Sequence, residues 1–101
     1  MKHYFVVSLV RGGILGGGLT ADDQQLCYHT GKLTVPDNIR RMPMPYQDIA
    51  AADAGWLLFL PTVTLTMKDG QTHRLMVFRR KKLLKIIAEK NPACVLPTKW
   101  A

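Results

Sequence analysis

The sequence lacks the patterns that would identify a function directly. Its two cysteines, Cys27 and Cys94, lie far apart without a companion ligand motif, which argues against both a disulfide framework and a zinc site. No apolar stretch approaches the length of a membrane span. Among only seven acidic residues, the adjacent Asp22 and Asp23 read as a turn. We expect no cofactor or metal, and a reducing, cytoplasmic setting, with peripheral attachment to a membrane as the alternative.

A run of three glycines, Gly16 to Gly18, also lacks its usual functional context. A phosphate loop would continue with Gly-Lys-Ser/Thr and open a helix, and neither signal follows. We interpret the run as a bend, or a close backbone approach, inside a strand. The N-terminus resembles the start of a signal peptide, but Arg11 interrupts the apolar run and no small-residue cleavage site follows.

What is present indicates a folded domain. With 101 residues, 48% hydrophobic and 21% charged, the chain has the composition of one globular unit. We expect this domain to occupy residues 1–92. Residues 93–101 form an irregular tail, in which Trp100 is a candidate to fold back on the body.

The strongest structural signal is a β-hairpin at residues 62–77, with a turn at Asp69-Gly70. A three-residue loop at positions 68–70 keeps apolar side chains on one face of both strands and places Gly70 at a left-handed position. This register pairs Leu65 with His73 and Val63 with Leu75. It predicts one core face, made of Val63, Leu65, Leu75 and Val77.

Five further strands are expected upstream, from their β-branched and aromatic residues and the turn residues between them. They cover residues 4–10, 14–20, 25–30, 39–44 and 46–53. Pro43 and Pro45 confine the fourth strand to an edge, and Ile49 and Ala51 share a face of the fifth. The apolar run from Trp56 to Leu60 is expected in the core, with an exposed contact as the alternative.

The chain then predicts a C-terminal amphipathic helix. Leu83, Leu84, Ile86 and Ile87 lie on one helical face that must pack on the sheet. Asn91-Pro92 ends the helix. The opposite face carries Lys81, Lys82, Lys85 and Glu89.

Several landmarks within residues 14–90 resemble the GRAM and bacterial PH-like families. They are the glycine-rich strand Gly17-Gly18-Leu19-Thr20 with the later Leu26-Cys27-Tyr28-His29-Thr30, the segment Met44-Pro45-Tyr46-Gln47-Asp48-Ile49, the loop Phe59-Leu60-Pro61 before the hairpin, and Phe78-Arg79-Arg80 at the helix start. The resemblance implies a mainly β fold: a bent antiparallel sheet or partly open barrel of about seven strands capped by one C-terminal helix. It also implies a non-enzymatic module that binds lipid headgroups, peptides or neighbouring domains.

Clustered cations are the best functional hint. The net charge is +7, and six of the 14 Lys and Arg residues fall between positions 79 and 90. Cations at a helix start oppose the helix dipole, and no Ser, Thr, Asp or Asn precedes them as an N-cap. Such local conflicts concentrate at functional sites. The predicted binding residues are Arg79, Arg80, Lys81, Lys82 and Lys85, extended by Arg40 and Arg41, for a protein partner or an anionic membrane surface. The alternative is a solvated helix face.

Three other classes of function have less support in the sequence. A nucleic-acid site would interleave aromatics with the cations, and only Phe78 is near. Cys27 and His29 share a strand face that suits a metal or a thiolate–imidazole pair. Nothing else supports catalysis, and we expect no enzyme. His3 and His73 are interpreted as edge or surface residues. Self-association into a homo-oligomer would use the Trp56–Leu60 run and a mixed hairpin face, Thr62, Thr64, Thr66, Arg74, Met76 and Phe78.

Overall fold

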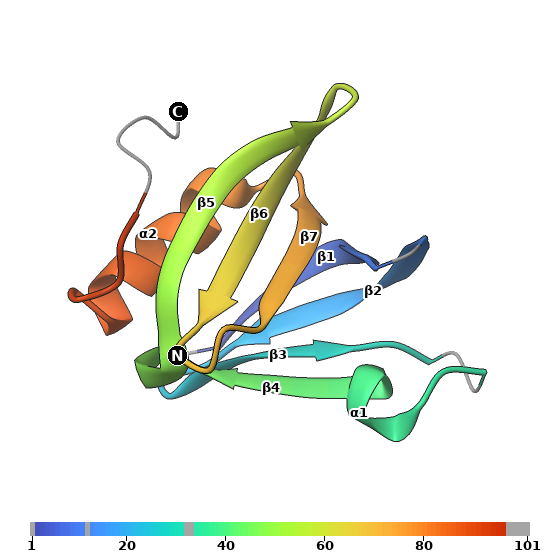
Figure 1. Ribbon diagram of the computed structural model, residues 1–101, viewed down its shortest axis with the longest axis horizontal. Coiled ribbons are helices and arrows are strands. Elements are labelled where there is room, and N and C mark those ends of the chain that lie inside the picture. Colours follow the sequence, from blue (N-terminus) through green and yellow to red (C-terminus); the bar gives the residue numbers. More distant parts are fainter. Residues whose placement is uncertain (1, 12, 32–33, 97–101) are drawn as a thin grey trace.

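The computed structural model describes residues 2–11, 13–31 and 34–96 (Figure 1). Its elements in chain order are β1 (His3–Val10), β2 (Ile14–Ala21), β3 (Gln25–His29), α1 (Asp37–Arg40), β4 (Arg41–Pro45), the 3₁₀ turn η1 (Tyr46–Asp48), β5 (Ile49–Leu57), β6 (Leu60–Met67), β7 (Thr72–Val77) and α2 (Arg80–Lys90).

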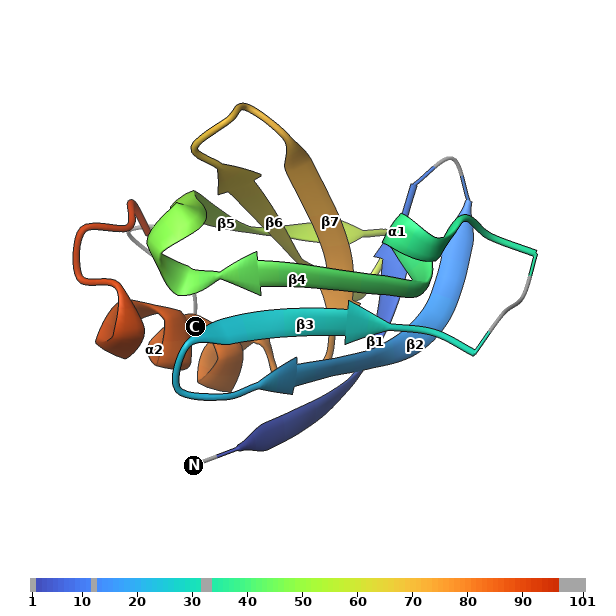
Figure 2. The same cartoon turned by 90° about the horizontal axis from the view of Figure 1, so that it is seen from below.

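The seven strands of the described chain form one antiparallel sheet in the order β4-β3-β2-β1-β7-β6-β5. The sheet curls at β1, so that β2–β4 and β5–β7 form two arms that face each other, and α2 covers one end of the space between them (Figures 1 and 2). The predicted mainly β architecture, a bent antiparallel sheet of about seven strands capped by one C-terminal helix, is confirmed. The short α1 and η1 were not predicted.

The β6–β7 hairpin has the register expected from its alternating residues. Leu65 pairs with His73 and Val63 pairs with Leu75. Gly70 has a φ of 92°, in the left-handed region that a Cβ disfavours. The four residues of the predicted core face, Val63, Leu65, Leu75 and Val77, are at most 1% exposed. The three-residue loop is therefore confirmed.

The core fills the space between the two arms and the inner face of α2. All four predicted apolar positions of the helix are buried. Two core tyrosines satisfy their hydroxyls on backbone carbonyls: Tyr28 donates to Leu15 at 2.9 Å and Tyr46 donates to Asp22 at 2.8 Å. Burial, with a smaller effect of Asp22 and Asp23, raises the pKa of Tyr46 to about 12. Both phenols are therefore neutral donors at physiological pH.

The end of α2 is tied to the corner between the two arms. Asn91 is the C-cap residue, as predicted, and its backbone N–H donates to Ile87. Its side-chain amide donates to the carbonyls of Tyr46 at 2.7 Å and Ile49 at 3.1 Å. Beyond it, Val95 forms a parallel bridge with Ala51. Trp100, the residue expected to fold back, lies outside the described residues.

The middle of the chain differs from the expected strand boundaries. Residues 39 and 40 belong to α1, and residues 46–48 belong to η1. Consequently β4 is short, and it is an edge strand, as Pro43 and Pro45 predicted. A register shift between Ile49 and Ala51 turns the chain, so that Ala52 is buried and Ala51 is not. The predicted shared face of Ile49 and Ala51 is therefore wrong, because a β-bulge breaks the two-residue period.

The apolar run from Trp56 to Leu60 was expected in the core, and this prediction is wrong. Leu57 pairs with Leu60, so Leu58 and Phe59 form the two-residue turn of a β5–β6 hairpin. That hairpin projects beyond the sheet (Figure 1). Trp56, Leu58 and Phe59 are 59%, 86% and 82% exposed. Their hydrophobicity predicts burial, but the projecting strands carry them away from the core.

Candidate functional site

The predicted basic cluster begins in the turn before α2 and continues along its outer face. Arg79 is the N-cap residue and makes no side-chain capping hydrogen bond, and the first turn contains no acid. Its guanidinium lies over the ring of Phe5, 5.7 Å from the ring centroid. Lys81, Lys82 and Lys85 are exposed. We call Arg79, Lys81, Lys82 and Lys85 the basic helix surface.

A groove of about 610 Å³ runs between this face of the helix and the start of β1. Its lining residues are His3, Lys81, Lys82, Lys85, Ile86 and Glu89. Three of these six residues are lysines, against the single acid Glu89. Because the N-terminal end of a helix carries partial positive charge, the dipole adds to the lysines in attracting an anion.

Arg80 was predicted as part of this exposed cluster, and the structure places it elsewhere. The residue is 8% exposed, and its Nη1 donates to the carbonyl of Gly55 at 2.5 Å. Its guanidinium stacks over the indole of Trp56, 4.6 Å from the ring centroid. Arg80 therefore joins the start of α2 to the base of the β5–β6 hairpin. It is not part of the basic helix surface.

Arg40 and Arg41 do not extend the basic helix surface. Arg40 belongs to α1, where it forms an ion pair with Asp37, and Arg41 is the first residue of β4, opposite His29. Both lie at the α1 end of the sheet, away from α2, in both views (Figures 1 and 2). The prediction that they enlarge the patch is not supported by their position.

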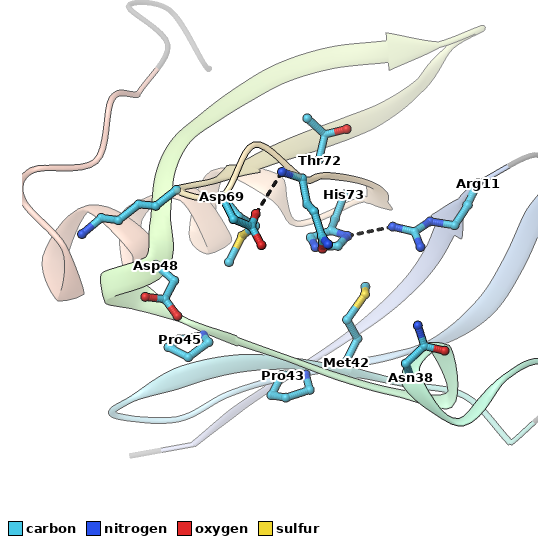
Figure 3. A pocket seen from close by; sticks show the side chains of 12 residues that line it. Arg11, Asn38, Met42, Pro43, Pro45, Asp48, Asp69, Thr72 and His73 are labelled. Atoms are coloured by element: carbon cyan, nitrogen blue, oxygen red, sulfur yellow. Dashed lines mark hydrogen bonds between the residues drawn. The ribbon is translucent and has the colours of Figure 1, made fainter.

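A second cavity, a cleft of about 760 Å³, opens between β4 and the β6–β7 turn (Figure 3). Its charged lining residues are of both signs: Arg11, Lys68, Asp48 and Asp69. Such a mixed rim has no strong preference for anions or cations. The basic helix surface is thus the better candidate for a charged partner.

His73 lies at the back of this cleft, and the prediction that it is a surface residue is wrong. It is 5% exposed, and its Nδ1 lies 3.1 Å from Nη2 of Arg11, which points toward it (Figure 3). The predicted register already contained the signal, because it pairs His73 with Leu65 on the core face. Burial, and then the positive charge of Arg11, lower the pKa of His73, while Asp69 opposes the shift.

We expect the fold to lose stability as the pH falls below the ordinary histidine pKa of about 6.5. Between that value and the lowered pKa of folded His73, the unfolded chain binds a proton that the folded chain does not, so acid favours unfolding. Urea denaturation at about pH 7.5 and about pH 5.5 should show this loss, and a smaller one in His73→Gln. An unchanged pH dependence in His73→Gln, or its disappearance in a His3→Gln control, would contradict the assignment.

Cys27 and His29 share the outer face of β3, as predicted from their spacing. Nε2 of His29 lies 3.2 Å from Oγ1 of Thr20, and its ring is 5.9 Å from that of Tyr4. Within residues 2–11, 13–31 and 34–96, no group of three or more His, Cys, Asp and Glu side chains is arranged to hold a metal ion. None of the helices described is long and apolar enough to cross a bilayer.

Comparison with known proteins finds a similar fold but gives no information on the site. No protein-family model matches the chain, and no curated protein matches it. Among solved structures, it is similar to the C-terminal domain of an unknown protein from Leishmania infantum, with a TM-score of 0.69 and 14% identity over 87% of this chain and 80% of that one. At this identity the similarity is one of fold alone.

Proposed function

We propose that this chain is a non-enzymatic binding module of the PH/GRAM-like type, and that its basic helix surface binds an anionic partner, either an acidic protein or a lipid headgroup surface. The observation that carries the proposal is the groove beside α2, where three exposed lysines, two of them in the first turn of the helix, face one acid. Lys81 and Lys82, in the first turn of α2, weaken the helix by about 0.3–1 kcal/mol each unless an anion is bound.

The charge distribution around the groove supports the same conclusion. Between positions 79 and 90 the sequence contains six Lys and Arg residues and a single acid, Glu89. Arg79, just outside the groove, is exposed like the three groove lysines. Positive charge therefore extends beyond the groove itself, and such a surface accelerates the approach of an anionic partner.

Replacing the three groove lysines together tests the proposal. The variant Lys81→Gln/Lys82→Gln/Lys85→Gln should bind vesicles containing phosphatidylserine about 100-fold more weakly than the parent, since each lysine near such a surface contributes about 1 kcal/mol. Binding to polyglutamate should fall as well, and both interactions should weaken as salt is raised above about 0.1 M. Co-sedimentation measures the first and fluorescence anisotropy the second.

The matched control is Arg40→Gln/Arg41→Gln/Lys68→Gln, which removes the same charge away from α2. It should retain most of the binding. Equal loss in both variants would show that only net charge matters, and an unaffected lysine variant, or a parent that binds neither probe, would remove the proposed role of the basic helix surface.

A further inference from the structure

Among the residues that the structure describes, the tip of the β5–β6 hairpin is the most exposed group of large apolar side chains in one run of sequence. Trp56, Leu58 and Phe59 are more than half exposed, and Leu57 and Leu60 form the closing pair. A contiguous apolar surface of this kind normally marks a contact with a partner or membrane.

The backbone conformation at the tip is also unfavourable for the residue found there. Leu58 has a φ of 57° and is the one non-glycine residue with a positive φ in the part of the chain that the structure describes. Two-residue hairpin turns with a positive φ at the first position favour glycine there, because the Cβ of any other residue crowds the backbone. At position 58, solvent exposure favours a polar residue and the positive φ favours glycine, yet the turn has leucine. Such a combination is typical of functional sites.

Cations surround the base of this tip. Arg80 stacks on Trp56 and donates to Gly55, and Nη2 of Arg74 donates to the Trp56 carbonyl at 3.0 Å. Because Arg80 opens α2, the hairpin base is held against the helix turn that carries Lys81 and Lys82. The apolar tip and the basic helix surface therefore belong to one connected part of the molecule.

We propose that the β5–β6 hairpin tip inserts into the interfacial region of an anionic lipid bilayer while the basic helix surface contacts the headgroups. This inference rests on the proposed function and names its partner. Leu58 and Phe59 extend about 7 Å beyond Trp56, at about 3.3 Å per strand residue, which matches the 5–10 Å depth to which interfacial segments enter a bilayer. Tryptophan and arginine at the base suit the headgroup level of a bilayer.

The variant Leu58→Gly/Phe59→Ser tests the insertion without endangering the fold. Glycine suits the positive φ of position 58, so thermal stability should be maintained or increased. Partitioning into phosphatidylserine vesicles should fall at least tenfold. The control Ile14→Thr/Val95→Thr removes two exposed apolar residues elsewhere and should partition like the parent.

Trp56 provides a direct reading of depth. In a Trp100→Phe background it is the single tryptophan, and its emission should shift to the blue and be quenched by lipids brominated near the headgroup end of the acyl chains. Phosphatidylcholine vesicles, which lack net charge, should give little of either effect, because the basic helix surface then has no partner.

The outcomes separate this inference from the proposed function. One outcome is that the parent binds vesicles in a salt-sensitive way, shows no quenching of Trp56 emission, and binds no better than the hairpin variant. That result leaves the proposed function intact and overturns insertion. Binding to polyglutamate but not to vesicles also overturns insertion and leaves the proposed function intact. So does the finding, by light scattering, that the parent is a dimer and the hairpin variant a monomer. A parent that binds neither probe overturns both.

Discussion

Replacement of Leu83 by alanine is expected to lower the free energy of unfolding by about 2–5 kcal/mol. Leu83 is 0% exposed and lies on the helix face that closes the core between the two arms of the sheet. Truncating it removes buried apolar surface and leaves a cavity that the surrounding strands fill only in part. Urea denaturation followed by circular dichroism measures the loss.

The neighbouring residue provides the control. Lys82 is exposed on the opposite side of α2, near the positive end of the helix dipole. Lys82→Ala should therefore leave stability unchanged or raise it by about 0.3–1 kcal/mol. Similar effects of the two substitutions would mean that α2 does not cap the core, and the architecture on which the binding proposals depend would be wrong.

Gly17→Ala is expected to destabilise the protein by about 1–3 kcal/mol or more. A Cβ at Gly17 would lie 2.4 Å from the backbone carbonyl oxygen of His29 and 3.0 Å from the hydroxyl of Tyr28. The carbonyl belongs to the adjacent strand and cannot rotate away, so β2 and β3 would have to separate. The measurement is the same urea denaturation.

Gly16→Ala is the matched substitution one residue earlier. A Cβ there would meet nothing within 4 Å, so stability should stay within about 0.5 kcal/mol of the parent. This pair tests the interpretation of the glycine run as a close backbone approach, since all three glycines lie inside β2. Equal costs at both positions would point instead to a general loss of backbone freedom.

The hairpin and the helix were predictable because their signals are local. Alternation over six residues and a glycine in the turn determine the register of β6–β7, and four apolar residues at helical spacing determine the inner face of α2. The bulge after Ile49 and the exposed hairpin tip were not predictable in this way. Hydrophobicity alone cannot distinguish a buried strand from one that runs past the end of its sheet.

The candidate site was predictable in composition but not in arrangement. Consecutive positions 79–82 identify a basic cluster, but their orientation depends on where the helix begins. Arg80 lies on the same helical face as Leu84 and Ile87, so its side chain is buried. There it donates to the Gly55 carbonyl and stacks on Trp56. Arg40 and Arg41 are separated from α2 by the sheet topology, which no local pattern encodes.

The two prolines of β4 affect how this protein meets other copies of itself. The Thr30 amide donates to Arg40 and the Tyr46 amide donates to Gln24, which fixes the hydrogen-bonding alternation along β3 and β4. Pro43 and Pro45 fall at the intervening positions, so their missing N–H groups would have faced the free edge. A foreign strand approaching there finds two absent donors, and fibre growth by edge-to-edge association is disfavoured on that side.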